Sequence, residues 1–173
     1  MFHFTSILKP NYSKELEQLM FFNPGQQTAL SAIVDSIEMY GEPIVYNDGE
    51  RLRLKVKKLG EVQTLFALDG NILAGVLLYS RVSLERLVVI HIAVDEDYSS
   101  QGKFAKKILV MRMSQQLRES ARRIKGIETI RMMYGVNRTR DYLVKRDIFH
   151  RQKTKVVTLD GIRECQEPIE RSV

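Results

Sequence analysis

The chain is poor in cysteine and has no long apolar run, and each shortage excludes a class of protein. Its single cysteine, Cys165, cannot form an intrachain disulfide and offers no set of thiolates for zinc. We therefore expect no metal site and a reducing, cytoplasmic setting. No apolar stretch approaches the roughly 18 residues of a membrane span, so we expect no membrane insertion. The first residues lack a basic segment followed by an apolar one, so we expect no signal peptide.

The remaining composition is that of an ordinary globular domain. The chain has 173 residues, of which 44% are hydrophobic and 28% are charged, and a chain of this length buries a sizeable core. It contains no internal repeat, low-complexity segment or linker. We therefore expect one domain over residues 1–173, and the sequence leaves its oligomeric state open.

Positive charge is concentrated in the second half of the chain. Residues 1–100 carry a net charge of −4 and residues 101–173 a net charge of +10. A basic half attracts anions, so coenzyme phosphates, an acidic protein and nucleic acid are all candidate partners, although a solvated basic helix face explains the same charge. Nucleic acid would be held by salt-sensitive phosphate contacts, because no helix-turn-helix, zinc or RNP motif is present. The basic residues concerned are Arg112, Arg118, Arg122, Arg123, Arg138, Arg140, Lys145, Arg146, Arg151, Lys153 and Lys155.

Two helices are predicted near the N-terminus. Residues 13–22 begin at a candidate N-cap, Ser13, and the breaker Asn23-Pro24-Gly25 follows them. Residues 27–40 have apolar side chains at i, i+3, i+4 and i+7, which is typical of a helix with one apolar face. Residues 2–8 precede both helices as a strand or an extended arm.

The rest of the chain predicts a sheet. Residues 51–57 alternate between apolar and basic side chains, and Asp69-Gly70-Asn71 predicts a tight hairpin turn. The succession of strand, helix and strand over residues 87–134 predicts a parallel pair. We therefore expect an α/β or α+β fold: a mixed, mostly antiparallel sheet with one parallel βαβ crossover and helices on both faces. The predicted elements are strands at 51–57, 62–68, 72–79, 87–94, 128–134 and 153–159, and helices at 102–124 and 137–146.

Residues 90–109 carry the most specific signal in the chain. An apolar strand ends at Val94, an acidic turn follows, and a Ser/Gly loop leads into the helix predicted from Gly102. A loop of this kind gathers backbone N–H groups at a helix N-terminus, where they form a natural anion site.

This segment and the order of the elements resemble the GNAT (Gcn5-related N-acetyltransferase) superfamily. The resemblance lies in Ile92-Ala93-Val94 at the strand end, in Tyr98, in Gln101-Gly102, in the helix expected to run on through Lys106-Lys107-Ile108-Leu109, and in Asn137 followed twelve residues later by Phe149. It covers roughly residues 62–159, and it implies the GNAT-like version of the mixed sheet described above.

The resemblance also implies a binding mode for acetyl-coenzyme A as a co-substrate. The pantetheine arm would pair with backbone groups of Ile92 and Val94, on either side of Ala93. Asn137 would help to order the coenzyme. The pyrophosphate would lie on N–H groups of the loop formed by Ser99, Ser100, Gln101, Gly102, Lys103 and Phe104, where Lys103, Lys106 and Lys107 add positive charge.

Two of these loop residues differ from those usual in the family. Ser99 stands where Arg or Gln is common, and Phe104 stands where Gly or Ala is common. The bulk of Phe104 must therefore point either into the core or into the coenzyme groove.

Such an enzyme needs a base near the amine. His91 is one candidate because histidine titrates near neutrality. Strand alternation places His91 opposite Ile90 and Ile92, and a satisfied core histidine is the alternative interpretation. Glu85, at the start of the same strand, is the second candidate.

The enzyme also needs an acid near the leaving thiolate. Val144 occupies the position where many GNAT enzymes have a tyrosine. Tyr142 and Tyr134 are the candidates that remain near it.

Our leading hypothesis is an N-acetyltransferase that moves acetyl from acetyl-coenzyme A to a primary amine by direct attack in a ternary complex. The acceptor, a small molecule or a protein, is left open. The alternative is a GNAT-like module without transferase activity that uses its basic half to bind nucleic acid or an acidic protein.

Overall fold

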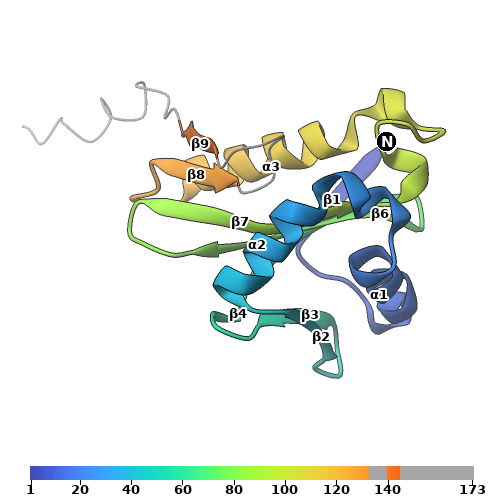
Figure 1. Ribbon diagram of the computed structural model, residues 1–173, viewed down its shortest axis with the longest axis horizontal. Coiled ribbons are helices and arrows are strands. Elements are labelled where there is room, and N and C mark those ends of the chain that lie inside the picture. The colour runs from blue at the N-terminus through green and yellow to red at the C-terminus, as the bar shows by residue number, and fades with distance from the viewer. Residues whose placement is uncertain (133–139, 145–173) are drawn as a thin grey trace, which may run out of the picture.

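A six-stranded mixed sheet forms the framework of the protein (Figure 1). The structure is a computed structural model and describes residues 1–132 and 140–144. Within these residues, β7 and β8 form the single parallel pair, and all other neighbouring strands run antiparallel. The predicted mixed, mostly antiparallel sheet with one parallel crossover is confirmed. Its strand order is β1 (Phe2–Thr5), β5 (Gln63–Asp69), β6 (Ile72–Arg81), β7 (Arg86–Val94), β8 (Thr129–Met132) and β9 (Arg140–Leu143).

A smaller sheet of β2 (Pro43–Asn47), β3 (Leu52–Val56) and β4 (Gly60–Glu61) packs beside the first. The predicted alternation in β3 is confirmed, because its three apolar side chains are buried while the basic residues between them are at least partly exposed. The preceding strand, β2, had no clear sequence signal.

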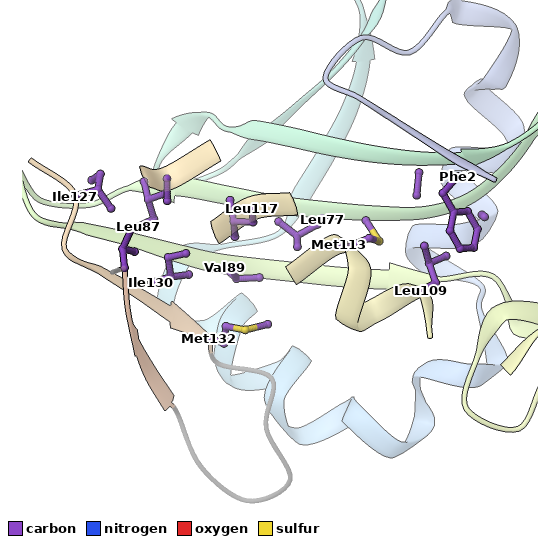
Figure 2. Packing of buried hydrophobic residues seen from close by; sticks show 14 of the residues in the cluster. Phe2, Leu77, Leu87, Val89, Leu109, Met113, Leu117, Ile127, Ile130 and Met132 are labelled. Carbon is purple, nitrogen blue, oxygen red and sulfur yellow. The ribbon is translucent and has the colours of Figure 1, made fainter. Parts of the chain in front are cut away.

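Helices cover both faces of the main sheet (Figure 1). α3 (Leu109–Arg123) covers one face, and its buried side chains Leu109, Met113 and Leu117 point toward the strands (Figure 2). α1 (Ser13–Phe21) covers the other face with Leu16, Leu19 and Met20. The sheet therefore has one hydrophobic core on each side.

α2 (Leu30–Tyr40) packs less deeply than its apolar stripe suggests. Leu30, Val34 and Ile37 are 59%, 44% and 36% exposed, and the one fully buried residue of the helix is the polar Ser36. The stripe correctly predicted a helix, although the helix begins at Leu30 and not at Gln27. Much of its apolar face is left outside the core.

Two predicted elements differ from those observed. The helix expected over 102–124 begins only at Leu109, after a 3-10 turn at Ala105–Lys107. Residues 140–143, expected to be helical, form β9. Tertiary pairing decides this, since β9 pairs with β8 along its length and Asp141 forms an ion pair with Arg131. The strand predicted at 153–159 lies outside the described residues.

Ile108 joins the 3-10 turn to α3 in a left-handed backbone conformation, with φ of 46°. A β-branched residue rarely adopts this conformation, and its side chain is 50% exposed. We expect Ile108→Gly to leave the free energy of unfolding unchanged or to raise it by up to about 1 kcal/mol, because relieved strain outweighs lost packing.

Urea unfolding measures the effect. The matched control is Val110→Gly, because Val110 lies inside α3 and is 41% exposed. This substitution should lower the free energy of unfolding by about 1 kcal/mol. An equal decrease for Ile108→Gly would show that Ile108 has a helical backbone conformation.

Candidate active site

An irregularity in β7 decides which way its only histidine faces. Leu78 of β6 pairs with His91 and Tyr79 pairs with Val89, so Ile90 is an extra residue in β7. Such a β-bulge puts two successive side chains on one face. Ile90 and His91 accordingly line the same pocket, whereas strand alternation had predicted opposite faces.

The pairing of β7 with β8 is described as far as this position. Met132, the last described residue of this stretch, lies opposite Val89, so within the described residues Ile90–Val94 has a strand neighbour, β6, on one side only. A strand edge to which no described strand pairs is called the open edge of β7 below.

The backbone of Ile92 and Val94 faces this open edge. The N–H of Asp95 donates to the carbonyl of Ala74 in β6, 2.9 Å away. Because bonded and non-bonded positions alternate along an antiparallel pair, Ala93 also bonds to β6. Ile92 and Val94, on either side of it, direct their N–H and C=O groups away from β6.

Side chains from the α1–α2 region meet part of this edge. The Ser36 hydroxyl donates to the carbonyl of Ile90, 2.6 Å away, and the Asn23 amide donates to the carbonyl of Val94. These contacts hold α2 and the turn before it against β7. Sequence reasoning missed both residues; a serine within the apolar stripe of a helix was the available signal for Ser36.

A pocket of about 440 Å³ lies between α2, the end of α1 and the bulge of β7. Its walls are mostly apolar, and His91, Gln26, Asn23 and Ser36 supply polar groups. The volume is in the range of sites for small molecules.

His91 lies in this pocket in its neutral form. The residue is 5% exposed, and burial lowers its pKa to about 4, because the charged ring loses its hydration. Its Nε2 atom lies 3.3 Å from the amide nitrogen of Gln26. The ring therefore acts at neutral pH as a hydrogen-bonding group and not as a charge.

The loop after β7 uses several of its own N–H groups. The N–H of Gly102 donates to the carbonyl of Ser99 (3.2 Å), and that of Phe104 donates to the carbonyl of Asp97 (2.6 Å). No helix begins at Gly102, because α3 starts only at Leu109. Together with the N–H of Ser99, which donates to the carbonyl of Glu96, three of the six N–H groups expected to hold an anion are thus bonded within the loop itself.

Gly102 has a steric role in this loop. A Cβ atom added there would lie 2.1 Å from the carbonyl oxygen of Glu96 and 2.4 Å from that of Asp97. The chain crosses itself so closely at this point that no side chain fits.

The side chain of Phe104 points toward the core, which decides between the two orientations left open above. Its ring centroid lies 5.0 Å from that of Tyr98, and it packs against the core on the α3 side. Lys107 lies over the Phe104 ring and forms an ion pair with Asp69.

Asp69 also accepts a hydrogen bond from the Tyr98 hydroxyl, 2.8 Å away. Burial and this carboxylate together raise the pKa of Tyr98 to about 12. Asp69 therefore ties the loop to the β5–β6 turn, and Lys107 is engaged there and not at a phosphate.

Two of the other predicted catalytic residues, Glu85 and Tyr142, lie away from the pocket. Glu85 is exposed in the turn before β7, at the opposite end of that strand from the loop. Tyr142 lies on β9, where the Arg118 guanidinium covers its ring at 4.6 Å. Tyr134 and Asn137 lie outside the described residues, as do most of the basic residues beyond α3. Of the three candidates that the structure describes, His91 alone lines the pocket.

Among the described residues, no group of three His, Cys, Asp or Glu side chains is arranged to hold a metal ion. In the same part of the chain, no helix combines the length and apolar character needed to cross a membrane.

Comparison with known proteins identifies no relative. No family model matches the chain, and no curated protein sequence matches it. Function is therefore inferred from the geometry of β7, its pocket and its loop.

Proposed function

We propose that the protein is a GNAT-like N-acetyltransferase that moves acetyl from acetyl-coenzyme A to an amine. The observation that carries this proposal is the edge of β7 over Ile90–Val94, which within the described residues pairs with a strand on the β6 side alone, beside a pocket that contains His91. A linear amide-containing arm can add to such an edge as an extra strand. The single cysteine is the support for a cytoplasmic location.

The open edge fits the pantetheine arm. Ile92 offers an N–H and a carbonyl toward the gap, while the Val94 carbonyl would have to exchange its Asn23 partner for a pantetheine amide. The pyrophosphate fits the loop less completely, because Gly102 and Phe104 already use their N–H groups. We therefore place it near Lys103 and Lys106, beside the first turn of α3.

The reaction requires the amine nitrogen to attack the thioester carbonyl. The C–N bond forms and the C–S bond breaks; the sulfur keeps the electron pair and takes up a proton, and the amine nitrogen loses one. Direct transfer needs both substrates to be bound together, so that the pocket and the open edge must be occupied at once. The proposed part of His91 is to orient the attacking amine by accepting a hydrogen bond from it, for which the ring would have to exchange its Gln26 partner for the amine.

Titration calorimetry with acetyl-coenzyme A tests the proposal. We expect Ile92→Pro to weaken binding at least about fivefold, since it removes an N–H that faces the open edge, whereas Ile92→Val should bind normally. Lys106→Glu should also weaken binding, whereas Lys125→Glu, an exposed lysine beyond the other end of α3, serves as its charge-matched control. No heat and no thermal shift at millimolar coenzyme would contradict the proposal.

The nucleic-acid alternative stays a prediction, because most of its basic residues lie outside the described part of the chain. A gel shift that falls steeply with salt, in the absence of coenzyme binding, would favour it.

A further inference from the structure

We propose that a second pocket binds a small, uncharged molecule that carries several hydroxyl groups, such as a monosaccharide. This pocket lies where the two sheets meet, between Ser6, β3 and the adjoining ends of β5 and β6, and we call it the junction pocket. Its volume of about 360 Å³ is in the range of sites for small molecules. Among the described residues it shares no lining residue with the pocket beside His91, so the inference does not rest on the proposed function.

The junction pocket exists because β1 leaves β5 early. β1 pairs only with the C-terminal part of β5, so Gln63 and Thr64 extend past its end. The chain then crosses to the smaller sheet, where the N–H of Leu52 in β3 donates to the carbonyl of Leu8, 2.8 Å away. Backbone hydrogen bonds therefore hold the walls of the pocket in place before any ligand arrives.

Four side chains that line the junction pocket carry hydrogen-bonding groups that the fold leaves available. They are those of Ser6, Gln63, Thr64 and Tyr79. None of their hydroxyl or amide groups forms a hydrogen bond with another described residue. A ligand in the pocket can therefore bond to them without displacing a partner within the protein.

Tyr79 shows that these groups are not lost in the interior. Its ring is half-buried at the end of β6, and burial raises the pKa of its hydroxyl, which stays protonated at neutral pH. Among the described residues, every fully buried side-chain nitrogen or oxygen atom has a hydrogen-bond partner. The Tyr79 hydroxyl has no such partner, so it must reach solvent.

The available groups match hydroxyl groups on a ligand. A serine, threonine or tyrosine hydroxyl both donates and accepts hydrogen bonds, and so does a glutamine amide. A ligand hydroxyl has the same double capacity and can use both. A carboxylate or phosphate oxygen only accepts and an ammonium group only donates, so an ionic group would use half of what these side chains offer.

The charged side chains beside the junction pocket balance one another. Arg53 forms ion pairs with Asp48 and Glu61. The Nε atom of Arg51 lies 3.5 Å from the Asp48 carboxylate. Because two guanidinium groups face two carboxylates, a charged ligand gains no net attraction and must compete with existing ion pairs. An uncharged ligand avoids this competition, and the remaining N–H groups of Arg51 can donate to its hydroxyl oxygens.

The floor of the junction pocket is apolar. Leu52, Leu54 and Val62 line it, and none of them is more than 7% exposed. A sugar ring has hydroxyl groups at its rim and C–H groups on its faces, so it can use the polar and the apolar walls together. This combination favours a cyclic polyhydroxylated molecule over a purely polar one such as urea.

The test compares three neutral hexoses with their charged derivatives in NMR titrations of the full chain. The hexoses are D-glucose, D-galactose and D-mannose, and each is paired with its uronate, an anion, and its 2-amino derivative, a cation at about pH 6.5. We expect at least one hexose to bind with millimolar affinity, and at least about fivefold more tightly than both of its charged derivatives. Tighter or equal binding of a charged derivative, or no binding of any hexose at high millimolar concentration, would overturn the proposal.

Two tyrosine variants locate the binding site. Tyr79→Phe keeps the half-buried ring and removes only the hydroxyl, so it should fold normally and weaken hexose binding at least about threefold. Tyr46→Phe is the matched control, because Tyr46 is a half-buried tyrosine on β2 that does not line the junction pocket. Equal effects of the two substitutions would place the sugar elsewhere and overturn the proposal.

A second pair of variants fills the pocket. Ser6→Trp, at an exposed position, should weaken hexose binding at least about tenfold by occupying the space, whereas the adjacent Ile7→Trp should bind normally. Ile7 is 55% exposed and does not line the pocket. Normal binding by Ser6→Trp would contradict the site. Acetyl-coenzyme A titrated into the same variants should bind as it does to the parent chain, which separates this inference from the proposed function.

Discussion

Replacing Gly102 with alanine is expected to lower the free energy of unfolding by about 3 kcal/mol. The added methyl group would lie 2.1 Å from the carbonyl oxygen of Glu96, and both atoms belong to backbone segments that cannot rotate away. Relief would require the loop after β7 to move, which would disturb the packing of Tyr98 and Phe104. Urea or thermal unfolding of the purified variant measures the loss.

A second glycine provides the control. Gly49 has a φ of 99° but open space around its Cβ position, so Gly49→Ala should lose only about 1 kcal/mol through backbone strain. A similar decrease in the free energy of unfolding at the two positions would contradict the close approach of the Glu96 and Asp97 carbonyls to Gly102. Because Gly102 is required sterically, a larger side chain there does not isolate an effect on coenzyme binding.

Acid is expected to destabilise the protein through His91 between about pH 6.5 and pH 4. Burial lowers the pKa of His91 from 6.5 to about 4 in the folded protein. Between pH 6.5 and about pH 4, His91 therefore binds a proton in the unfolded chain but not in the folded chain. The free energy of unfolding falls as the pH falls through this interval. A tenfold difference in proton affinity is worth about 1.4 kcal/mol, so the loss approaches about 3 kcal/mol near pH 4.

His91→Gln should remove this pH dependence, because glutamine can hydrogen bond to Gln26 but does not titrate. The control is His3→Gln, an exposed position on β1, which should keep the acid sensitivity of the parent protein. The paired carboxylates Asp48, Asp69 and Asp141 have lowered pKa values and lose their stabilising charge below the usual 3.8, outside this interval. An unchanged slope in His91→Gln would show that the ring is solvated.

Much of the fold follows from local patterns. The helical spacing of Ala105, Leu109, Met113, Leu117 and Ala121 predicts one buried face for the helix expected over 102–124. The last four are buried on α3, whereas Ala105 lies in the 3-10 turn before it and is half-buried. The alternation in β3 and the Asp69-Gly70 turn were equally readable. The helix and strand signals are reliable because the side chains of one element alternate regularly between the core and the solvent.

The candidate site was less predictable, and His91 shows why. Strand alternation predicted that His91 lies on the face of the sheet opposite Ile90. Because Ile90 is an extra residue in β7, the two side chains lie on the same face. A bulge depends on how β6 and β7 pair, which local pattern does not record. The late start of α3 and the formation of β9 were missed for the same kind of reason. Packing of the loop before α3 and pairing of β9 with β8 outweigh the local preference for helix.

The amino-acid sequence by itself therefore determined the class of fold, the order of most elements and the strand–loop–helix segment that suggests a coenzyme site. Only the tertiary structure decided that Ile90 forms a bulge in β7, that His91 enters a pocket beside α2, and that Gly102 serves a chain crossing. The physical reason is that periodic burial is a property of one segment, whereas pairing register, chain crossings and pocket walls arise only when distant segments meet.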